Sequence, residues 1–313
     1  MVEPSAKREV LCYLQENYQV NQSLGCRTIN LSRSSSYRKS TKDDSEVENK
    51  LSSLAEEFPT RGVDNYYLRI RLEGLKWNRK RVLRVYRKMN LKMRRKHRKR
   101  IHRPYKEALC QPIMPNVMWS MDFMQDSLED GRKVRILIVI DDYNRECLAI
   151  ICGISMPSAR VIRILEQVIE CKGKPERIRT DNGPEFISLE IEEWFKHNTI
   201  DHLAIQPGKP NQNGFVERFN RTFREDILDA YIFESYHQLQ IISDEWKDKY
   251  NNGHPHQSLN GMTPIGFKYS RREIIAAFEK VKAKQSESLT RDPALTLSPS
   301  AMLDAREYLN QNI

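Results

Sequence analysis

Three acidic residues stand far apart in the chain, each in a short polar motif: Asp122 in WSMDFM, Asp181 in RTDNGPEF and Glu217 in NGFVERFN. Carboxylates brought to one point repel one another, so their ionised forms need a cation to hold them together. Mg²⁺ takes oxygen ligands and is commonly bound by a few carboxylates together with substrate phosphates. Two such ions roughly 4 Å apart activate an attacking hydroxyl and stabilise the leaving oxygen in a phosphoryl displacement. The acids therefore predict metal-dependent phosphoryl transfer with two Mg²⁺ ions, for which Mn²⁺ can substitute.

Basic and amide side chains surround the last of these acids. Arg221 and Arg224 follow Glu217 at i+4 and i+7, on the same face of a predicted helix. A surface ion pair between Glu217 and Arg221 is the alternative interpretation, and it is the default for an isolated match. The presence of the other two acids in their own motifs favours Glu217 as a metal ligand beside a phosphate backbone. The DNA contacts predicted here are Asn213, which is also expected to cap the helix, Arg218, Asn220, Arg221 and Arg224.

Other polar residues are interpreted as structural. Asp141 and Asp142 lie at a strand-to-turn junction, where Asp commonly caps the turn, and this role is favoured over metal binding. Glu185 is interpreted as an exposed acid at the start of a helix. His254 and His256 form an HxH motif without a nearby pair of cysteines, so a zinc site is not expected.

Residues 104–270 are predicted to form the domain that carries the acids. Strand patterns occur at PNVMWSMDFMQ, VRILIVI and CLAIICG, and helices then alternate with the short strands RIRTD and HLAIQ. The order βββαβαβα predicts an α/β fold, an RNase H-like core with a mixed five-stranded sheet and flanking helices. In that topology Asp122 and Asp181 lie on neighbouring strands, and Glu217 arrives on a helix packed across the same edge.

Two all-α units are predicted before this domain. Residues 1–42 are expected to form a helix-turn-helix whose Ser- and Arg-rich last helix suits a major groove, with a plain three-helix bundle as the alternative. Residues 43–103 are predicted to form a second helical unit, with Asn78 as a helix cap, followed by a basic linker. Residues 271–313 are expected to contain a helix and a flexible tail.

Positive charge is concentrated at the N-terminal end. The net charge is +10, but residues 1–103 alone hold 26 Lys and Arg against 11 Asp and Glu. A segment with this much positive charge predicts contact with a polyanion. Double-stranded DNA is the expected polyanion, because binding would release many counterions from the duplex. The alternative is that the basic linker is only solvated. The cations predicted to contact DNA in this part are Arg33, Arg38, Arg79, Lys80, Arg84, Arg94, Arg95 and Arg98.

The composition limits the compartment. The six cysteines are scattered without a CxxC pair, which favours reduced thiols over a disulfide framework or a zinc cage. No apolar run approaches the length of a membrane span, and the first residues lack the apolar core of a signal peptide. These features predict a cytoplasmic protein without a membrane partner.

The blocks around the acids resemble those of the insertion sequence three family of transposases, specifically the product of the second open reading frame, which are relatives of retroviral integrases. WSMDFM, IDDYNRE, RTDNGPEF and PGKPNQNGFVERFNRTFRED resemble the family's D, D and E blocks, and 35 residues separate Asp181 from Glu217 as in its D,D(35)E spacing. Arg224, two turns after the glutamate, and the block HPHQSLNGMTPIGF also resemble the family. Residues 61–90 look like the family's second helix-turn-helix, so the resemblance implies that residues 43–103 are a second helix-turn-helix with a basic linker. Linked blocks in this order are far more specific than any single acid.

The resemblance implies a DDE transposase that nicks the ends of an insertion sequence and joins the freed 3′ hydroxyl to another phosphodiester. Asp122, Asp181 and Glu217 would be its catalytic metal ligands. Implied partners are the terminal inverted repeats and target DNA, further copies of the chain, and an upstream-frame product or fusion, at the bacterial nucleoid. Two rival functions stay open: an RNase H-type nuclease that cuts without joining, and a sequence-specific DNA-binding regulator.

Overall fold

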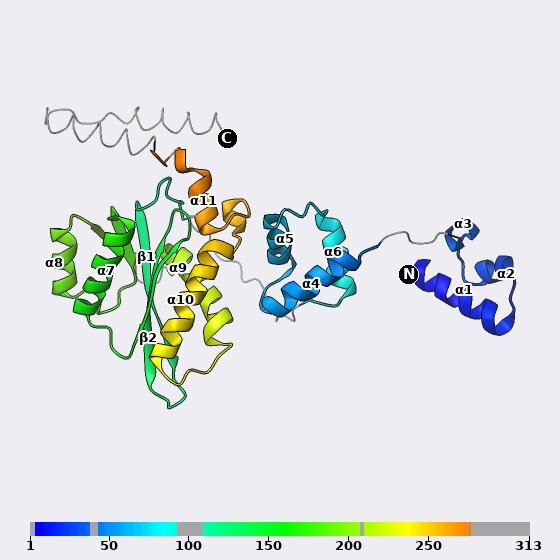
Figure 1. Ribbon diagram of the computed structural model, residues 1–313, viewed down its shortest axis with the longest axis horizontal. Coiled ribbons are helices and arrows are strands. Elements are labelled where there is room, and N and C mark those ends of the chain that lie inside the picture. Colours follow the sequence, from blue (N-terminus) through cyan, green and yellow to red (C-terminus); the bar gives the residue numbers. More distant parts are fainter. Residues whose placement is uncertain (1–3, 38–42, 93–108, 207–209, 274, 277–313) are drawn as a thin grey trace.

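The computed structural model describes residues 4–37, 43–92, 109–206, 210–273 and 275–276. The residues outside these ranges include most of the predicted C-terminal tail and four predicted DNA contacts, Arg38, Arg94, Arg95 and Arg98. Figure 1 shows a first helical unit at the N-terminal end, a second helical unit in the middle and a core built on a sheet. Within the described part of the chain, no helix combines the length and apolar character that crossing a bilayer demands.

The first helical unit contains three helices in the predicted order: α1 (Pro4–Tyr18), α2 (Gln22–Thr28) and α3 (Arg33–Ser36). Its small core is formed by Leu11, Cys26 and Leu31. The side chains of Asn21 and Ser32 accept hydrogen bonds from backbone N–H groups that the starts of α2 and α3 leave free. Short helices are thus held by caps and a few buried side chains, and their helix-turn-helix role stays a prediction.

The second helical unit also has three helices: α4 (Ser45–Glu57), α5 (Val63–Leu72) and α6 (Arg79–Lys88). Leu51, Ile70 and Val82, one from each helix, are fully buried in a shared core. The Asn78 side chain accepts a hydrogen bond from Lys80 N, which confirms the predicted cap. The apolar stripe of α6 therefore faces inward and its basic residues face outward.

The core sheet has five strands in the order β3-β2-β1-β4-β5. β1 pairs antiparallel with β2 and parallel with β4, while β2–β3 is antiparallel and β4–β5 parallel. This is the mixed RNase H-like sheet that the sequence predicts. The strands are β1 (Met118–Ser127), β2 (Lys133–Asp141), β3 (Cys147–Gly153), β4 (Arg177–Thr180) and β5 (Asp201–Ala204).

Helices cover both faces of the sheet (Figure 1), so side chains on alternate positions of a strand enter different cores. Trp119 and Met121 of β1 lie in the core beneath α7 and α8, whereas Met124 lies in the core with α9 and α10. Asp122 shares the parity of Met124 and therefore lies on the α9 side. The helices are α7 (Ser158–Lys172), α8 (Leu189–His197), α9 (Gly214–Phe223), α10 (Tyr236–Gly253) and α11 (Pro264–Ser270).

The second helical unit is fastened to the core through Asp226, in the π-helical turn η2 (Arg224–Leu228) that continues α9. Thr60 Oγ1 donates to Asp226 Oδ1 at 2.9 Å, and Arg61 Nη2 lies 2.5 Å from Oδ2. Trp246 Nε1 of α10 donates to the same Oδ2 at 3.1 Å. Because the Asp226 and Arg61 side chains are only 19% and 11% exposed, this pair is largely shielded from solvent.

Candidate active site

Asp122 and Asp181 lie at the same level on neighbouring parallel strands. β1 and β4 are paired up to Ser120 opposite Arg179, and two residues further along each chain come Asp122 and Asp181. β4 ends at Thr180, which places Asp181 just past the strand's end. There its Oδ1 accepts the N–H of Gly183 at 3.1 Å, in the tight turn that the Asn-Gly motif predicts.

Helix α9 lies across the same edge of the sheet. Val216 and Phe219 are buried in the core beneath it, which directs Glu217 and Asn220, one turn apart, toward β1. Asn220 Nδ2 donates to Asp122 Oδ2 at 2.7 Å. Glu217 is exposed, and within the described residues its carboxylate has neither a hydrogen bond nor an ion pair. The helix therefore brings one anchored amide and one free carboxylate to Asp122.

The three acids share one electrostatic environment. Burial, followed by the negative charges of Asp181 and Glu217, raises the pKa of Asp122 to about 6. The Phe123 N–H and the Asn220 amide work in the opposite direction by donating hydrogen bonds to the carboxylate. Among the described residues, no three His, Cys, Asp or Glu side chains lie close enough together to form a ready metal cluster. The acids therefore create a negative potential at this edge of the sheet, but in the described residues they do not form a complete set of metal ligands.

The basic residues of α9 and η2 have different partners. Arg224 Nη2 donates to Gln125 O of β1 at 3.0 Å. Arg221 Nε lies 2.8 Å from Glu225 Oε1, so the alternative of a Glu217–Arg221 ion pair is wrong. Arg218 lies on a different side of the helix and lines a separate pocket. DNA contacts of these arginines stay predictions.

The Asn213 side chain contacts the sheet. Asn213 occupies the predicted N-cap position of α9, but its side chain makes no capping hydrogen bond. Instead Asn213 Nδ2 donates to Met121 O of β1 at 3.2 Å, and the residue is only 3% exposed. A backbone carbonyl beside Asp122 is thereby tied to the start of α9. The chain position of Asn213, directly before the helix, gives no sign of this long-range bond.

Asp141 and Asp142 have the structural roles that the sequence predicts. Asp141 accepts hydrogen bonds from the backbone N–H groups of Asn116 and Tyr143, both within 2.9 Å. Asp142 Oδ2 lies 3.0 Å from Arg179 Nη1. Both acids are nearly fully buried. They hold the turn after β2 against the strands on either side of it.

Glu185 is not the exposed acid that the sequence predicts. Its Oε1 is paired with Arg135 Nη1 of β2, and the side chain is only 17% exposed. The Arg135 guanidinium in turn lies 4.3 Å from the centre of the Phe123 ring. This chain of contacts joins the loop after Asp181 to the residue that follows Asp122. The pair spans 50 residues, so no local pattern could have predicted it.

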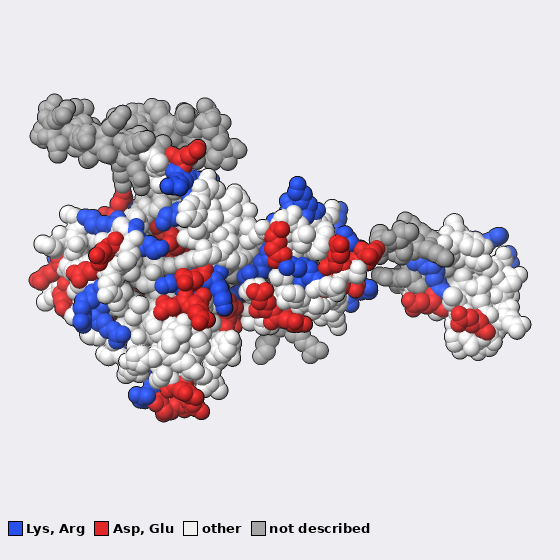
Figure 2. Space-filling view, viewed as in Figure 1, with Lys and Arg blue, Asp and Glu red and all other residues white. Residues whose placement is uncertain are grey.

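The described cations of the helical units are partly neutralised. Arg79 lies 2.6 Å from Asp64 and Arg84 lies 2.8 Å from Asp44, while Lys80 is exposed, as is Arg33 in the first unit. Figure 2 shows acidic and basic patches side by side on the second unit. The excess of positive charge in this half of the sequence is therefore not a uniformly basic face in the described residues.

His254 and His256 are packed among aromatic rings. Their ring centroids lie 4.9 Å apart, and each also lies against Tyr250, at 5.1 and 5.4 Å. Burial and, to a smaller extent, nearby arginines lower the pKa of both imidazoles, that of His256 to about 3. Both rings are therefore neutral at ordinary pH, and they lie within the pocket that Arg218 lines.

Comparison with known proteins gives two matches to a family model described as the integrase core domain, over residues 112–210 and 198–264. The insertion element IS407 uncharacterized 31.7 kDa protein of Burkholderia multivorans (strain ATCC 17616 / 249) is 32% identical over 274 residues, which are 86% of this chain and 99% of that protein. The insertion element IS476 uncharacterized 39.2 kDa protein of Xanthomonas euvesicatoria is also 32% identical, over 84% of this chain and 77% of its own length.

Among solved structures, the integrase catalytic core domain of HTLV-2 in complex with magnesium is similar at 22% sequence identity and a TM-score of 0.38, covering 50% of this chain and 97% of that one. The identity to the insertion-element proteins extends over most of the chain. Together with the integrase core matches, it shows that the chain belongs to the insertion-sequence transposases of the DDE integrase superfamily.

Proposed function

We propose that this protein nicks DNA at the ends of an insertion sequence and transfers the freed 3′ hydroxyl to another phosphodiester. The observation that carries the proposal is that three acids from separate elements face one sheet edge, although among the described residues they do not form a closed ligand set. Asp122 of β1 is level with Asp181, which directly follows β4, and Glu217 lies on the helix whose Asn220 is bonded to Asp122. Strand joining needs such a site to hold a 3′ hydroxyl in line with the phosphodiester that it attacks, whose own 3′ oxygen leaves.

Divalent metal is the expected cofactor, and the residues present fit it. Glu217 is exposed and unpaired among the described residues, Asp181 has only one backbone donor, and the charges of both disfavour ionisation of Asp122. Uncompensated negative charge of this kind suits a hard cation with oxygen ligands. We propose that the three carboxylates hold two Mg²⁺ ions, or Mn²⁺ in their place. When bound, such ions activate the attacking oxygen and stabilise the leaving one.

The other residues at this edge orient the acids and the substrate. Asn220 fixes the rotamer of Asp122 through its amide, and Asn213 ties the start of α9 to β1. Arg221 and Arg224, on the Glu217 side of the helix, are placed to lie along a phosphate backbone. Arg224 already spans from η2 to β1, so its guanidinium borders the proposed path of the DNA.

The proposed substrates are double-stranded terminal repeats and target DNA. The two helical units are proposed as the modules that recognise the repeats, because they carry the exposed Arg33 and Lys80. Joining two element ends to one target requires more than one active site, so we propose that copies of the chain assemble on DNA. An upstream-frame product or a fusion with it is a further proposed partner.

A labelled-end assay tests the function. Purified protein is incubated with a labelled terminal fragment and supercoiled plasmid in Mg²⁺, and the products are separated on a denaturing gel. Joined products support the transposase. Cleavage without joining supports the nuclease, and retarded but intact DNA supports the regulator. The Glu217→Gln variant must lose both reactions while it still binds DNA, since only the metal-dependent steps need that carboxylate.

A further inference from the structure

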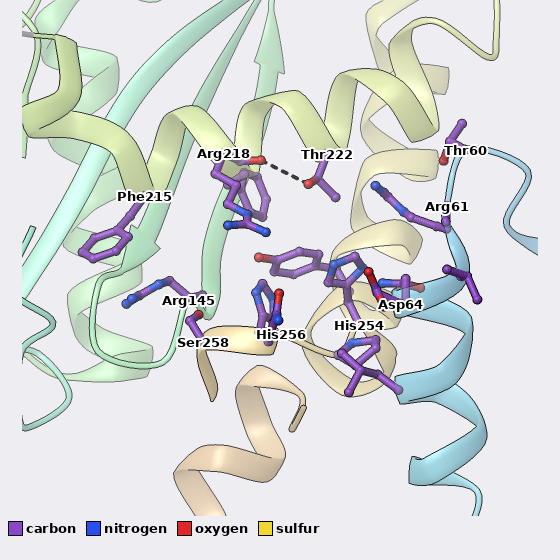
Figure 3. A pocket seen from close by; sticks show the side chains of 18 of the residues that line it. Thr60, Arg61, Asp64, Arg145, Phe215, Arg218, Thr222, His254, His256 and Ser258 are labelled. Carbon is purple, nitrogen blue, oxygen red and sulfur yellow. Dashed lines mark hydrogen bonds between the residues drawn. The ribbon is translucent and has the colours of Figure 1, made fainter. Parts of the chain in front are cut away.

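A pocket of about 600 Å³ lies between the second helical unit and the core, on the side of α9 away from Glu217. One helix face supplies Phe215, Arg218, Phe219 and Thr222, at spacings of i, i+3, i+4 and i+7. Figure 3 shows the Arg218 side chain extending from this helix toward His256 across the pocket. This space is separate from the edge where the three acids meet, and a volume of this size suits a small organic ligand.

The pocket exists because the second helical unit is docked on the core. The loop before α5 forms one wall, and Thr60 and Arg61 in that loop hold the carboxylate of Asp226. Leu68 of α5 also packs closely over Gly261. A Cβ atom at position 261 would lie only 2.8 Å from Leu68 Cδ2, so the contact favours glycine there. Two parts of the chain that are far apart in sequence therefore enclose the space.

Two arginines give the pocket a positive potential. Within the described residues, the Arg218 guanidinium donates no hydrogen bond and forms no ion pair. Arg145 donates to the carbonyl oxygen of Asp142 and to Gln111 Oε1, neither of which carries a charge. Arg61 is already paired with Asp226. An anionic group entering the pocket would thus meet Arg218, which has no carboxylate partner in the described residues, and Arg145, which forms no ion pair although the charges of Asp141 and Asp142 act on it.

A buried imidazole nitrogen also faces this space without a partner. His256 Nε2 is inaccessible to solvent and makes no hydrogen bond in the described residues. The charges of Arg145, Arg218 and Arg61 act with burial to keep this ring neutral, so it can donate or accept a hydrogen bond. A buried polar atom that is left unpaired costs free energy, and a ligand that pairs with it recovers that cost.

Aromatic side chains complete the lining. The Phe215 ring has one face covered by the Arg145 guanidinium at 3.6 Å from its centroid. Tyr250 lies at the back of the pocket, stacked between Trp246 and His254 at centroid distances of 5.0 and 5.1 Å. Phosphate-binding cations beside aromatic rings and a neutral imidazole form a combination that suits a nucleotide, since rings bind bases in a sequence-tolerant way.

We propose that this pocket binds one unpaired nucleotide of a DNA strand, with its phosphate at Arg218 and Arg145 and its base beside His256 and Phe215. The proposal deepens the proposed function and rests on it, because a strand running from the second helical unit to α9 would pass the pocket. A base in a duplex is stacked and paired, so only a nucleotide that has left the helix can enter.

Binding is measured on the full chain in EDTA, so that no metal-dependent step is required. The probes are thymidine 5′-monophosphate, deoxyribose 5-phosphate and inorganic phosphate, followed by calorimetry and by the His256 imidazole signals in NMR spectra. We expect thymidine 5′-monophosphate to bind at least about tenfold more tightly than either base-free probe and to shift the His256 signals. Equal affinity for all three probes would overturn the assignment of a nucleotide.

Variants localise the binding. Arg218→Gln removes an exposed side chain that has no partner in the described residues, so the fold should be kept while affinity for thymidine 5′-monophosphate falls at least about tenfold. The matched control is Arg163→Gln, an exposed arginine of α7, which should change affinity less than about twofold. If Arg218→Gln binds as the unaltered chain does, the pocket assignment is wrong.

The test also separates the pocket from the proposed reaction. Nucleotide binding that depends on Arg218, in a protein that never joins DNA ends, would support the pocket and refute strand transfer. Joining activity with no nucleotide binding in EDTA would refute the pocket and leave strand transfer standing. His256→Gln adds a second readout, because it should reduce the preference for thymidine 5′-monophosphate over inorganic phosphate without abolishing phosphate binding.

Discussion

Two groups of acids lie close to the same sheet, and they differ in what surrounds them. The pKa of Asp122 and that of Asp142 are both raised to about 6, and burial is the largest cause in each case. The charges of Asp181 and Glu217 act in the same direction as burial on Asp122, whereas the neighbours of Asp142, including Ser120 and Arg179, oppose it. A raised pKa alone therefore does not separate a functional carboxylate from a structural one.

The separating property is whether the charge is compensated inside the protein. Asp142 is paired with Arg179, and Glu146 accepts from Lys172 and Lys268 at 2.8 and 3.2 Å. Glu217, in contrast, has no partner in the described residues. Acids whose charge the fold pairs with a cation hold the fold together, and acids that it has left without a cation are available to a ligand. The predictions below test this division.

The largest effect is expected for Glu217→Gln. The change removes one negative charge from the candidate site and should lower strand joining at least about a thousandfold, a barrier increase of roughly 4 kcal/mol. The free energy of unfolding should change by less than about 0.5 kcal/mol, because the side chain is exposed and unpaired among the described residues. Joining rates and urea denaturation check the two statements. A large loss of stability would place Glu217 with the structural acids.

The next effect is expected for Asp142→Ala, and it falls on stability. Arg179, whose side chain is 15% exposed, would be left without its partner, so the free energy of unfolding should fall by about 3 kcal/mol. Urea denaturation measures the loss, and the double variant Asp142→Ala with Arg179→Met should recover part of it. Joining activity per folded molecule should stay within about tenfold. A greater loss in molecules shown to be folded would contradict the structural assignment.

A smaller effect is expected for Asn220→Ala. Its amide is bonded to Asp122 at 2.7 Å, so the change frees the rotamer of that carboxylate and should lower joining by about 10- to 100-fold. Raising the Mg²⁺ concentration should restore part of the rate if the loss arises from weakened metal binding. The control is Asn198→Ala, whose amide bonds to Trp194 O at the end of α8. Equal losses in both variants would count against a positioning role for Asn220.

The smallest effect concerns pH. Burial opposes ionisation of Glu146, but the hydrogen bond from Lys172 and the charge of Lys268 outweigh it and lower the pKa. The folded pKa lies below the unfolded one, so the stability from this acid is present above about pH 4.3 and is lost as pH falls further. Both lysines are more than a third exposed, so Glu146→Gln should cost only about 1 kcal/mol at pH 7. The two stability curves should converge in acid, and a constant gap would be inconsistent with this origin.

Periodicity and turn chemistry predicted the order of the core elements and the elements that carry the three acids. β3 begins and ends where the apolar run CLAIICG does, and Asn78 caps α6 as its position predicts. These features depend on residues that are neighbours in sequence. The sequence also predicted that Asp122 and Asp181 approach each other, because the RNase H-like topology pairs their strands in parallel, but the register that makes them level comes from the structure.

Contacts between distant side chains could not be predicted in the same way. The bond from Asn213 to Met121 and the pair of Arg135 with Glu185 each join separate elements through one atom pair. Asn220 lies one turn after Glu217, so helix spacing indicated its face, but its partner depends on how deeply α9 packs. The docking by Asp226 joins residues about 165 positions apart and has no local signal.

That docking also determines where an autonomous core must start. A protein trimmed at residue 104, the boundary that composition indicates, lacks Thr60 and Arg61 and leaves Trp246 as the only described donor to Asp226. Asp226 follows Glu217 by nine residues along one continuous helical segment. A displacement of the second helical unit would therefore move the helix that carries Glu217. The shortest fragment that keeps α9 and η2 attached to the second helical unit therefore begins before α4.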